Sequence, residues 1–270
     1  MKKICWLSDL HLDFVGSVRI KDFFREINER GFDYILVSGD TGTSTPLITY
    51  LNQMKENIDS QIYFVLGNHD YYGSSFNNVN QKIKLYSDKN EKIKWFTDIK
   101  PNLIDDDLVL IGDDGWADAR FGKPFESGVD LNDFHKIEEL TGLLIHDRVK
   151  SLNKLGDKSA ERIKNKLVES VEMADNILIV THVPPFKESA WYGGLPSGDE
   201  WLPWFTSKAF GDVLIEFSEN YKDKKFLVLA GHTHGESDSN IRDNLRVLTP
   251  ETEYGVIDIK MIFDKSIFTW

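Results

Sequence analysis

The sequence predicts an α/β fold in which parallel strands alternate with helices and two sheets carry helices on their outer faces. Three observations lead to this prediction. Short runs rich in Ile, Val, Leu and aromatic residues recur along the chain, segments of helical length separate the first three runs, and each run ends in a polar cluster. Strands alternating with helices favour parallel pairing. No repeat, low-complexity tract or flexible linker interrupts the chain, so we expect one domain over residues 1–270.

Five apolar runs are the expected buried strands, because each is short and is bounded by turn-forming residues. They lie near 4–9, 33–40, 62–70, 176–182 and 226–234. The carboxyl ends of parallel strands open into one crevice, where open α/β sheets bind their ligands. The polar residues that close these runs are therefore the first candidates for a functional site.

The segments between the runs predict the helices. One helix is expected near 17–30, where Gly31 stops it, and a second near 46–57, because Pro46 is tolerated in a first helical turn. Residues 137–174 carry apolar side chains at three-to-four spacing, which predicts one or two amphipathic helices. The short alternating runs within 244–270 predict antiparallel strands that close a second sheet.

Composition limits the partners and the compartment. The chain has 44 acidic and 32 basic residues, a net charge of −12, and no basic run, so long nucleic acid is not expected as a partner. The amino-terminal apolar run is too short for a signal peptide, and no window reaches the roughly 18 to 20 apolar residues of a membrane span. Cys5 is the single cysteine, so no internal disulfide can form. We expect a cytoplasmic protein; the sequence leaves its oligomeric state open.

Histidines gather at the ends of the predicted strands. Five of the seven lie there, namely His11, His69, His182, His232 and His234. In an extended backbone, residues two apart point to the same side, so Asp9 and His11 are expected to face one ion together. His232 and His234 repeat this spacing.

Asp40 and Asn68 complete the set of expected ligands. The two carboxylate oxygens of Asp40 can bridge two ions, whereas Asn68 offers a neutral carbonyl oxygen. Imidazole and carboxylate donors without a thiolate suit Mn, Fe, Zn, Co or Ni better than Ca. Manganese is the ion that we expect.

The order of these motifs resembles the calcineurin-like metallophosphoesterase superfamily. Asp-x-His, Gly-Asp, Gly-Asn-His-Asp, a further His and Gly-His-Thr-His span the chain from Asp9 to His234. The resemblance implies a four-layer α/β/β/α sandwich of two mixed sheets, with two divalent metal ions at the carboxyl ends of the strands. It implies that Asp40 bridges the two ions. The implied ligands are Asp9, His11 and His234 for the first ion, and Asn68, His182 and His232 for the second.

The resemblance also implies that His69 is the acid that protonates the leaving-group oxygen. From its place next to His69 in the sequence, Asp70 is the candidate to orient that ring, with turn capping as the alternative. Two divalent ions outweigh the charges of Asp9 and Asp40, so the site would attract phosphate even on an acidic protein. The implied function is hydrolysis of phosphoesters by a metal-activated water. The alternative is a non-catalytic, metal-bearing interaction module of the same fold, although every ligand position is filled.

One departure from the family pattern bears on the substrate. Protein Ser/Thr phosphatases of the superfamily carry Gly-Asp-x-x-Asp-Arg-Gly, whereas the run from Gly39 is Gly-Asp-Thr-Gly-Thr-Ser. We therefore expect a small phosphomonoester, phosphodiester or nucleotide rather than a phosphoprotein. Arg120 is a candidate phosphate ligand, or it pairs with a neighbouring Asp at 113, 114 or 118. Trp191 and Tyr192, in the aromatic loop 183–205, either stack on substrate or pack the loop down.

Overall fold

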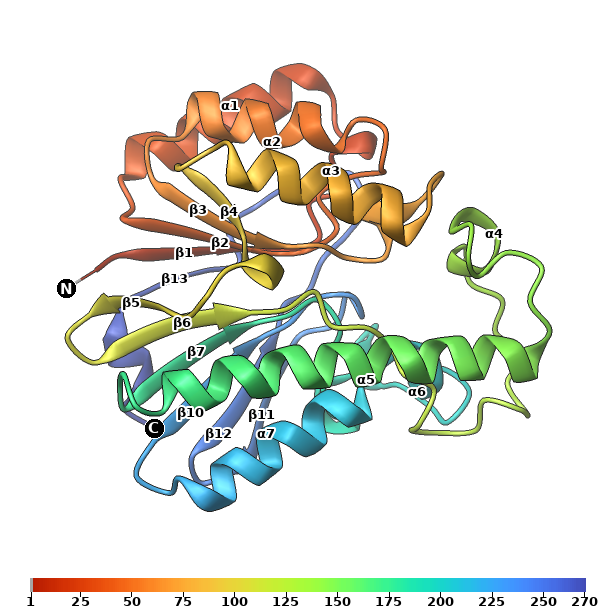
Figure 1. Ribbon diagram of the computed structural model, residues 1–270. Helices are drawn as coiled ribbons and strands as arrows, with labels where there is room; N and C mark the ends of the chain where they lie inside the picture. Colours follow the sequence, from red (N-terminus) through yellow and green to blue (C-terminus); the bar gives the residue numbers. More distant parts are fainter. Residues whose placement is uncertain (1) are drawn as a thin grey trace.

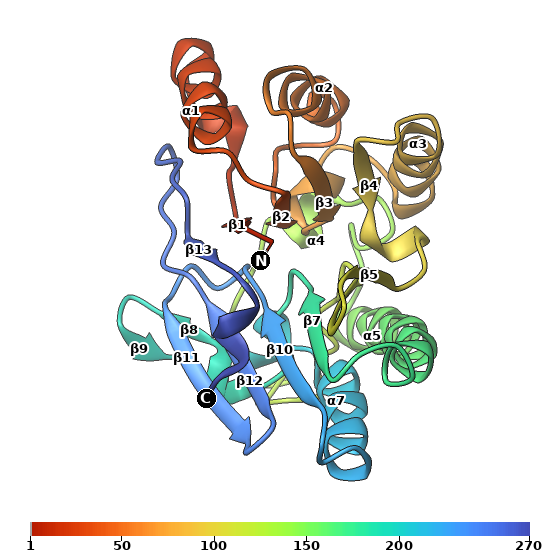
Figure 2. The ribbon, with the colours of Figure 1, turned by 90° about the vertical axis from the view of Figure 1, so that its left-hand side faces the viewer.

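The computed structural model describes residues 2–270 and has two large sheets stacked between two layers of helices (Figure 1). The first sheet has the strand order β13-β1-β2-β3-β4, and the second has the order β11-β12-β10-β7-β6-β5. Helices α1, α2 and α3 cover the outer face of the first sheet, and α5 and α7 cover the second, as Figure 2 shows from the end that carries both termini. The predicted four-layer α/β/β/α sandwich of mixed sheets is confirmed.

The first sheet is built from the amino-terminal part of the chain and one late strand. Strands β1 to β4 pair in parallel in chain order, and β13 is antiparallel to β1. The strands are β1 (Ile4–Leu7), β2 (Tyr34–Ser38), β3 (Gln61–Val65), β4 (Ile93–Trp95) and β13 (Met261–Phe263). The helices are α1 (Ser17–Arg30), α2 (Leu47–Asn57) and α3 (Phe76–Asp88). The first two helices begin within one residue of the predicted bounds.

The second sheet has a parallel centre and antiparallel edges. Strands β6, β7, β10 and β12 are parallel, whereas β5 and β11 run against their neighbours. The strands are β5 (Asn102–Asp105), β6 (Leu108–Gly112), β7 (Asn176–Val180), β10 (Lys225–Leu229), β11 (Ser237–Arg242) and β12 (Leu245–Thr249). The covering helices are α5 (Ile145–Ser170) and α7 (Lys208–Asn220). Short elements include α4 (Asp133–Lys136), α6 (Leu202–Phe205) and a hairpin of β8 (Trp191–Tyr192) and β9 (Leu195–Pro196).

In the later part of the chain, one expectation agrees with the structure and another needs correction. The segment 137–174 contains one helix, α5, of 26 residues, and turns precede it. No helix among residues 2–270 is both long and apolar enough to cross a membrane.

The tail 244–270 does not form an antiparallel set on the second sheet, because β12 is parallel to β10 and β13 joins the first sheet beside β1. Alternating apolar residues indicate a strand but do not specify the edge that it joins.

Three apolar clusters explain why the strand sequences are almost continuously apolar. In β2, Leu36 faces the second sheet, whereas Ile35 and Val37 pack under the helices of the first sheet. In β7, Leu178 faces the first sheet, and Ile177 and Ile179 pack under α5 and α7. Both faces of each central strand are therefore buried, which removes the polar-apolar alternation of a half-exposed strand.

A buried lysine ties α5 to the second sheet. Lys166 is 9% exposed, and its ammonium donates hydrogen bonds to the carbonyl oxygens of Phe96, Thr97 and Gly112. Burial lowers the pKa of Lys166 from 10.5 to about 8. Between these two pKa values Lys166 is protonated in the unfolded chain and mostly deprotonated in the folded chain. The free energy of unfolding therefore rises with pH over this interval.

We expect Lys166→Met to remove this pH dependence. Between about pH 7.5 and pH 9.5 the wild-type protein should gain about 2 kcal/mol of unfolding free energy relative to the variant. Urea unfolding of both proteins at the two pH values measures the change. Parallel pH dependence in the two proteins would contradict the assignment of a lowered pKa to Lys166.

Candidate active site

The seven expected metal ligands all follow strands of the two sheets, at one end of the sandwich. Asp9 and His11 follow β1, Asp40 follows β2, and Asn68 follows β3. His182 follows β7, and His232 and His234 follow β10. Both sheets supply ligands, so the site lies where the carboxyl ends of their parallel strands face each other.

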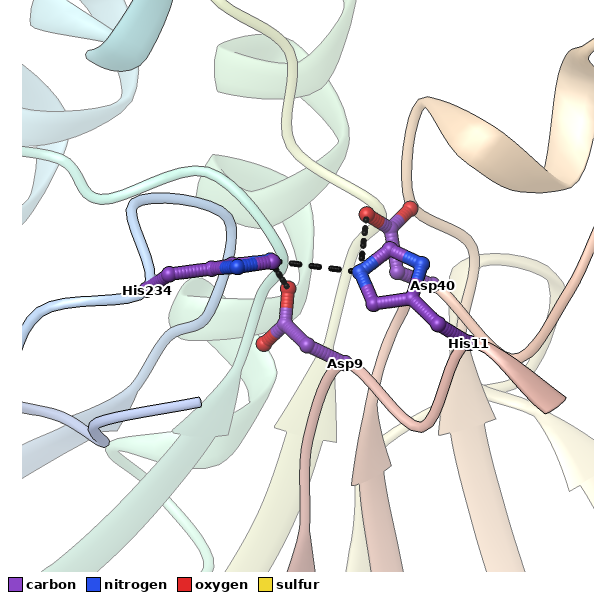
Figure 3. A group of neighbouring side chains, drawn as sticks. All are labelled: Asp9, His11, Asp40 and His234. Carbon is purple, nitrogen blue, oxygen red and sulfur yellow. Dashed lines mark hydrogen bonds and ion pairs between the residues drawn. The ribbon is translucent and has the colours of Figure 1, made fainter. Parts of the chain in front are cut away.

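A first cluster is formed by Asp9, His11 and His234, with Asp40 beside it (Figure 3). The Nε2 atoms of His11 and His234 are 3.2 Å apart, and Asp9 Oδ1 is 3.5 Å from His234 Nε2. Donor atoms of all four residues lie within 4.8 Å of one another. Two carboxylates and two imidazoles at this spacing are a suitable donor set for a divalent transition metal.

A second cluster is formed by Asn68, His182 and His232. Asn68 Oδ1 is 3.0 Å from His182 Nε2 and 3.0 Å from His232 Nδ1. The opposite ring nitrogens face carbonyl oxygens, of Ser38 at 2.8 Å and of Trp204 at 3.0 Å. A carbonyl oxygen only accepts hydrogen bonds, so in neutral rings the protons lie on those outer nitrogens. Three lone pairs then converge inside the cluster, which is an arrangement that a cation stabilises.

Two hydrogen bonds from its side-chain nitrogen fix the amide orientation of Asn68. Its Nδ2 donates hydrogen bonds to Asp133 Oδ1 at 2.8 Å and to the hydroxyl of Tyr72 at 3.1 Å. The Tyr72 hydroxyl in turn donates to Asp133 at 2.6 Å. Because the amide nitrogen is held by acceptors, the amide oxygen points at the two histidines. Asp133 and Tyr72 are supporting residues that the sequence analysis did not identify.

Asp40 lies between the two clusters. Its Oδ2 is 3.6 Å from His11 Nε2, and its Oδ1 is 3.5 Å from His182 Nε2. Oδ1 also accepts a hydrogen bond from the backbone N–H of His69 at 2.9 Å. One carboxylate oxygen thus faces each cluster, which is the geometry that a bridging ligand requires.

Burial sets the electrostatics of the site. It lowers the pKa values of His11, His182 and His232, which keeps these rings neutral and their lone pairs available. Burial and then the charge of Asp9 raise the pKa of the Asp40 carboxyl well above its usual value. Two buried carboxylates in mutual repulsion are unfavourable unless positive charge compensates them. The residues present therefore fit divalent metal ions.

The backbone at the ligands differs from the expected extended geometry. Strand β1 ends at Leu7, before Asp9, so Asp9 and His11 do not share one side of a strand. Five ligands have left-handed backbones, with φ of 48° at Asp9, 39° at His11, 52° at Asp40, 72° at His232 and 56° at His234. Such conformations are strained for residues other than glycine and cluster at functional sites. Tight turns, rather than strand alternation, direct these side chains, and they send His232 and His234 to different clusters.

Gly67 leaves the space that Asp40 occupies. A Cβ atom at position 67 would lie 2.1 Å from Asp40 Oδ1, closer than any two such atoms can approach. The glycine that precedes Asn68 and His69 in the motif is therefore required by the close packing of the bridging carboxylate.

His69 lies beside the first cluster, at the edge of a cavity of about 520 Å³. Its ring centroid is 4.5 Å from that of His11 and 4.3 Å from that of Tyr72. Its Nε2 is 3.3 Å from the hydroxyl oxygen of Tyr254. Tyr254 lies in the tail segment that was expected to form strands, and no local pattern marked it as part of the site.

Asp70 makes the contacts of a turn-capping residue. Its carboxylate accepts hydrogen bonds from the backbone N–H groups of Gly42 at 3.0 Å and Gly67 at 2.8 Å. Burial raises the pKa of Asp70 to about 7, against the opposing effect of these bonds. Asp70 therefore braces the loops that carry Asp40 and Asn68, whereas Tyr254 is the residue whose hydroxyl faces the ring of His69.

The three candidate substrate residues lie in different places. The Arg120 guanidinium pairs with Asp118 at 3.1 Å and with Asp157 at 2.6 Å, outside the cavity lining, so the ion-pair alternative describes it. Trp191 donates its indole N–H to the carbonyl oxygen of Glu188 at 2.8 Å and also lies outside the lining. Tyr192 does line the cavity.

Known proteins share the fold. The phosphopantetheinyl hydrolase of Mycobacterium tuberculosis has a TM-score of 0.65 at 14% identity, over 93% of this chain and 89% of that one. A dimetal phosphatase from Danio rerio has a TM-score of 0.54 at 14% identity, over 93% and 87% of the two chains. The inner membrane complex anchor of Plasmodium has a TM-score of 0.53 at 14% identity, over 96% and 76%. A comparison with curated protein sequences found no match.

The family is established by a direct match. The family model described as calcineurin-like phosphoesterase matches residues 2–236, which include every ligand of both clusters. The chain belongs to the calcineurin-like phosphoesterase family and is a metal-dependent phosphoesterase.

Proposed function

We propose that the protein hydrolyses a small phosphomonoester or phosphodiester with two divalent ions, manganese first among the candidates. The ligand sets are Asp9, His11 and His234 for one ion, and Asn68, His182 and His232 for the other. The observation that carries the proposal is the position of Asp40, whose oxygens face His11 at 3.6 Å and His182 at 3.5 Å. A carboxylate so placed can serve two ions at once.

The chain's own residues have distinct parts in this reaction. Bound divalent ions would supply a water of lowered pKa and stabilise charge on the phosphoryl oxygens. Asp40 holds the backbone N–H of His69, which fixes the acid residue relative to the ligands. His69 would donate a proton to the leaving-group oxygen, because its ring borders the cavity. The Tyr254 hydroxyl, 3.3 Å from His69 Nε2, would keep the ring in position.

We further propose that residues 1–270 act as one catalytic domain in the cytoplasm. Ligands follow β1, β2 and β3 of the first sheet and β7 and β10 of the second, so neither sheet holds the site alone. The single cysteine, Cys5, is buried and free, which suits a reducing compartment.

Metal reconstitution tests the proposed function. Protein stripped by a chelator should be inactive on 4-nitrophenyl phosphate and bis(4-nitrophenyl) phosphate. Addition of manganese should restore turnover of at least one ester as two ions bind per chain. Two bound ions without turnover of any ester in a broad panel would instead support the non-catalytic, metal-bearing module.

A further inference from the structure

The cavity beside the metal clusters is lined by two unlike groups of side chains. One group consists of metal-cluster residues and His69, and the other of Tyr192, Leu195, Trp201 and Phe205, which we name the apolar wall. The volume of about 520 Å³ is within the range of pockets that enclose small organic ligands. A phosphoester with its phosphoryl group at the clusters would place its leaving group against this wall.

Three side chains of the apolar wall are exposed to solvent. Tyr192 is 65% exposed, Leu195 is 70% exposed and Trp201 is 37% exposed. Tyr192 and Leu195 pair directly across the β8–β9 hairpin, which puts their side chains on the same face. The Phe205 ring is 5.2 Å from the ring of Trp201 and 5.2 Å from that of His232, so aromatic side chains lead from the wall to the second cluster. An apolar group lying there would cover this surface and be stabilised by its burial.

The cavity lining has no cation for a second phosphate. Among the described residues that line it, Asp133 and Glu253 are the charged side chains besides the cluster residues, and none is Lys or Arg. Lys136 approaches from outside, with Nζ 5.3 Å from the ring centroid of Tyr72. A second phosphate carried by the leaving group would therefore be repelled by the carboxylates of Asp133 and Glu253 and would find no Lys or Arg in the lining.

The hairpin that carries Tyr192 and Leu195 of the apolar wall is fixed relative to the first cluster. A Cβ atom at Gly235, the residue after His234, would lie 2.1 Å from the carbonyl oxygen of Trp191, so the start of the hairpin packs directly on the His234 loop. The hairpin is also closed at its base, because the N–H of Ser197 donates to the carbonyl oxygen of Ala190 at 2.8 Å. The wall can thus select a leaving group by its distance from the reacting phosphorus.

We infer that the enzyme selects phosphoesters whose leaving group is uncharged and apolar or aromatic, without a second phosphate, and that Tyr192, Leu195 and Trp201 bind that group. The inference rests on the proposed function, since the wall contacts the leaving group only when the phosphoryl group lies at the clusters. It predicts discrimination against bisphosphates, because no Lys or Arg lines the cavity to pair with a second phosphate.

Two matched pairs of substrates test this selectivity on the manganese-loaded full chain. 4-Phenylbutyl phosphate and ethyl phosphate have leaving groups of similar basicity and differ in apolar area. Adenosine 5′-phosphate and adenosine 3′,5′-bisphosphate differ by one phosphate. We expect kcat/KM to favour the phenylbutyl ester and the monophosphate, each by about tenfold or more.

Variants assign the selectivity to the apolar wall. Trp201→Ala and Leu195→Ala should each reduce the phenylbutyl-to-ethyl ratio of kcat/KM several-fold. Leu144→Ala is the matched control, because Leu144 is 76% exposed and lies outside the cavity, and its ratio should equal that of the wild type. Equal kcat/KM within both substrate pairs, or wall variants with unchanged ratios, would overturn the inference while the proposed function stands. Two bound ions with no turnover of any ester would overturn both.

Discussion

Asp40→Ala is expected to lose metal binding and turnover together. The substitution removes the carboxylate whose two oxygens face His11 in the first cluster and His182 in the second. Bound metal should fall below two ions per chain, and kcat/KM should fall by about 10³-fold or more, since metal stabilisation of the transition state is worth several kcal/mol. Elemental analysis and steady-state kinetics on one preparation measure both effects.

Asp212→Ala is the control for this result. Asp212 is an exposed residue of α7 that pairs with Lys208 on the same helix, so its loss should change neither metal content nor kcat/KM. Thermal unfolding of both metal-free variants checks that each is folded. Two ions per chain in folded Asp40→Ala would refute the bridging assignment.

His69→Ala is expected to lower turnover while both ions stay bound. The imidazole borders the cavity, and its loss removes the group that would protonate the leaving-group oxygen. The loss in kcat should be about 10² to 10⁴-fold for alkyl phosphates, and much smaller for 4-nitrophenyl phosphate, whose leaving group needs little protonation. Kinetics on both esters, with metal analysis, measure this pattern. Equal losses for the two esters would contradict the acid role.

Tyr254→Phe separates positioning from catalysis. This variant keeps the ring that packs 5.9 Å from the ring of His69 and removes the hydroxyl at 3.3 Å from Nε2. If Tyr254 acts through His69, Tyr254→Phe should lose more turnover of alkyl phosphates than of 4-nitrophenyl phosphate. This is the pattern expected for His69→Ala, but with smaller losses. A purely structural role of Tyr254 would lower turnover of both esters equally.

The central strands could be predicted because their surroundings are uniform. Strands β1, β2, β3, β7 and β10 are buried on both faces, so each is a continuous apolar run. Helices α3 and α7 and strands β4, β5 and β6 were not predicted; α3 starts with Phe-Asn-Asn, in which Asn is a weak helix former, and β4 has only three residues. The place of β13 beside β1 depends on contacts between residues that lie 255 to 259 positions apart in the chain.

The candidate ligands could be predicted because each one follows the end of a strand. The residues that hold these ligands and His69 in position could not be predicted. Asp133 and Tyr254 come from connecting segments, and only the folded chain brings them to Asn68 and His69. Asp157, the second ion-pair partner of Arg120, lies in α5 and is far in sequence from the neighbouring Asp residues at 113, 114 and 118. The left-handed turns at the ligands were also missed, because residue type alone does not indicate a positive φ at Asp or His.

Anomalous X-ray diffraction from crystals grown with manganese tests the two-ion centre most directly. We predict two peaks about 3.5 to 4 Å apart, with Asp40 in contact with both. One peak should lie among Asp9, His11 and His234, and the other among Asn68, His182 and His232. A single peak, or a second peak without contact to Asp40, would contradict the two-ion centre on which the proposed function depends.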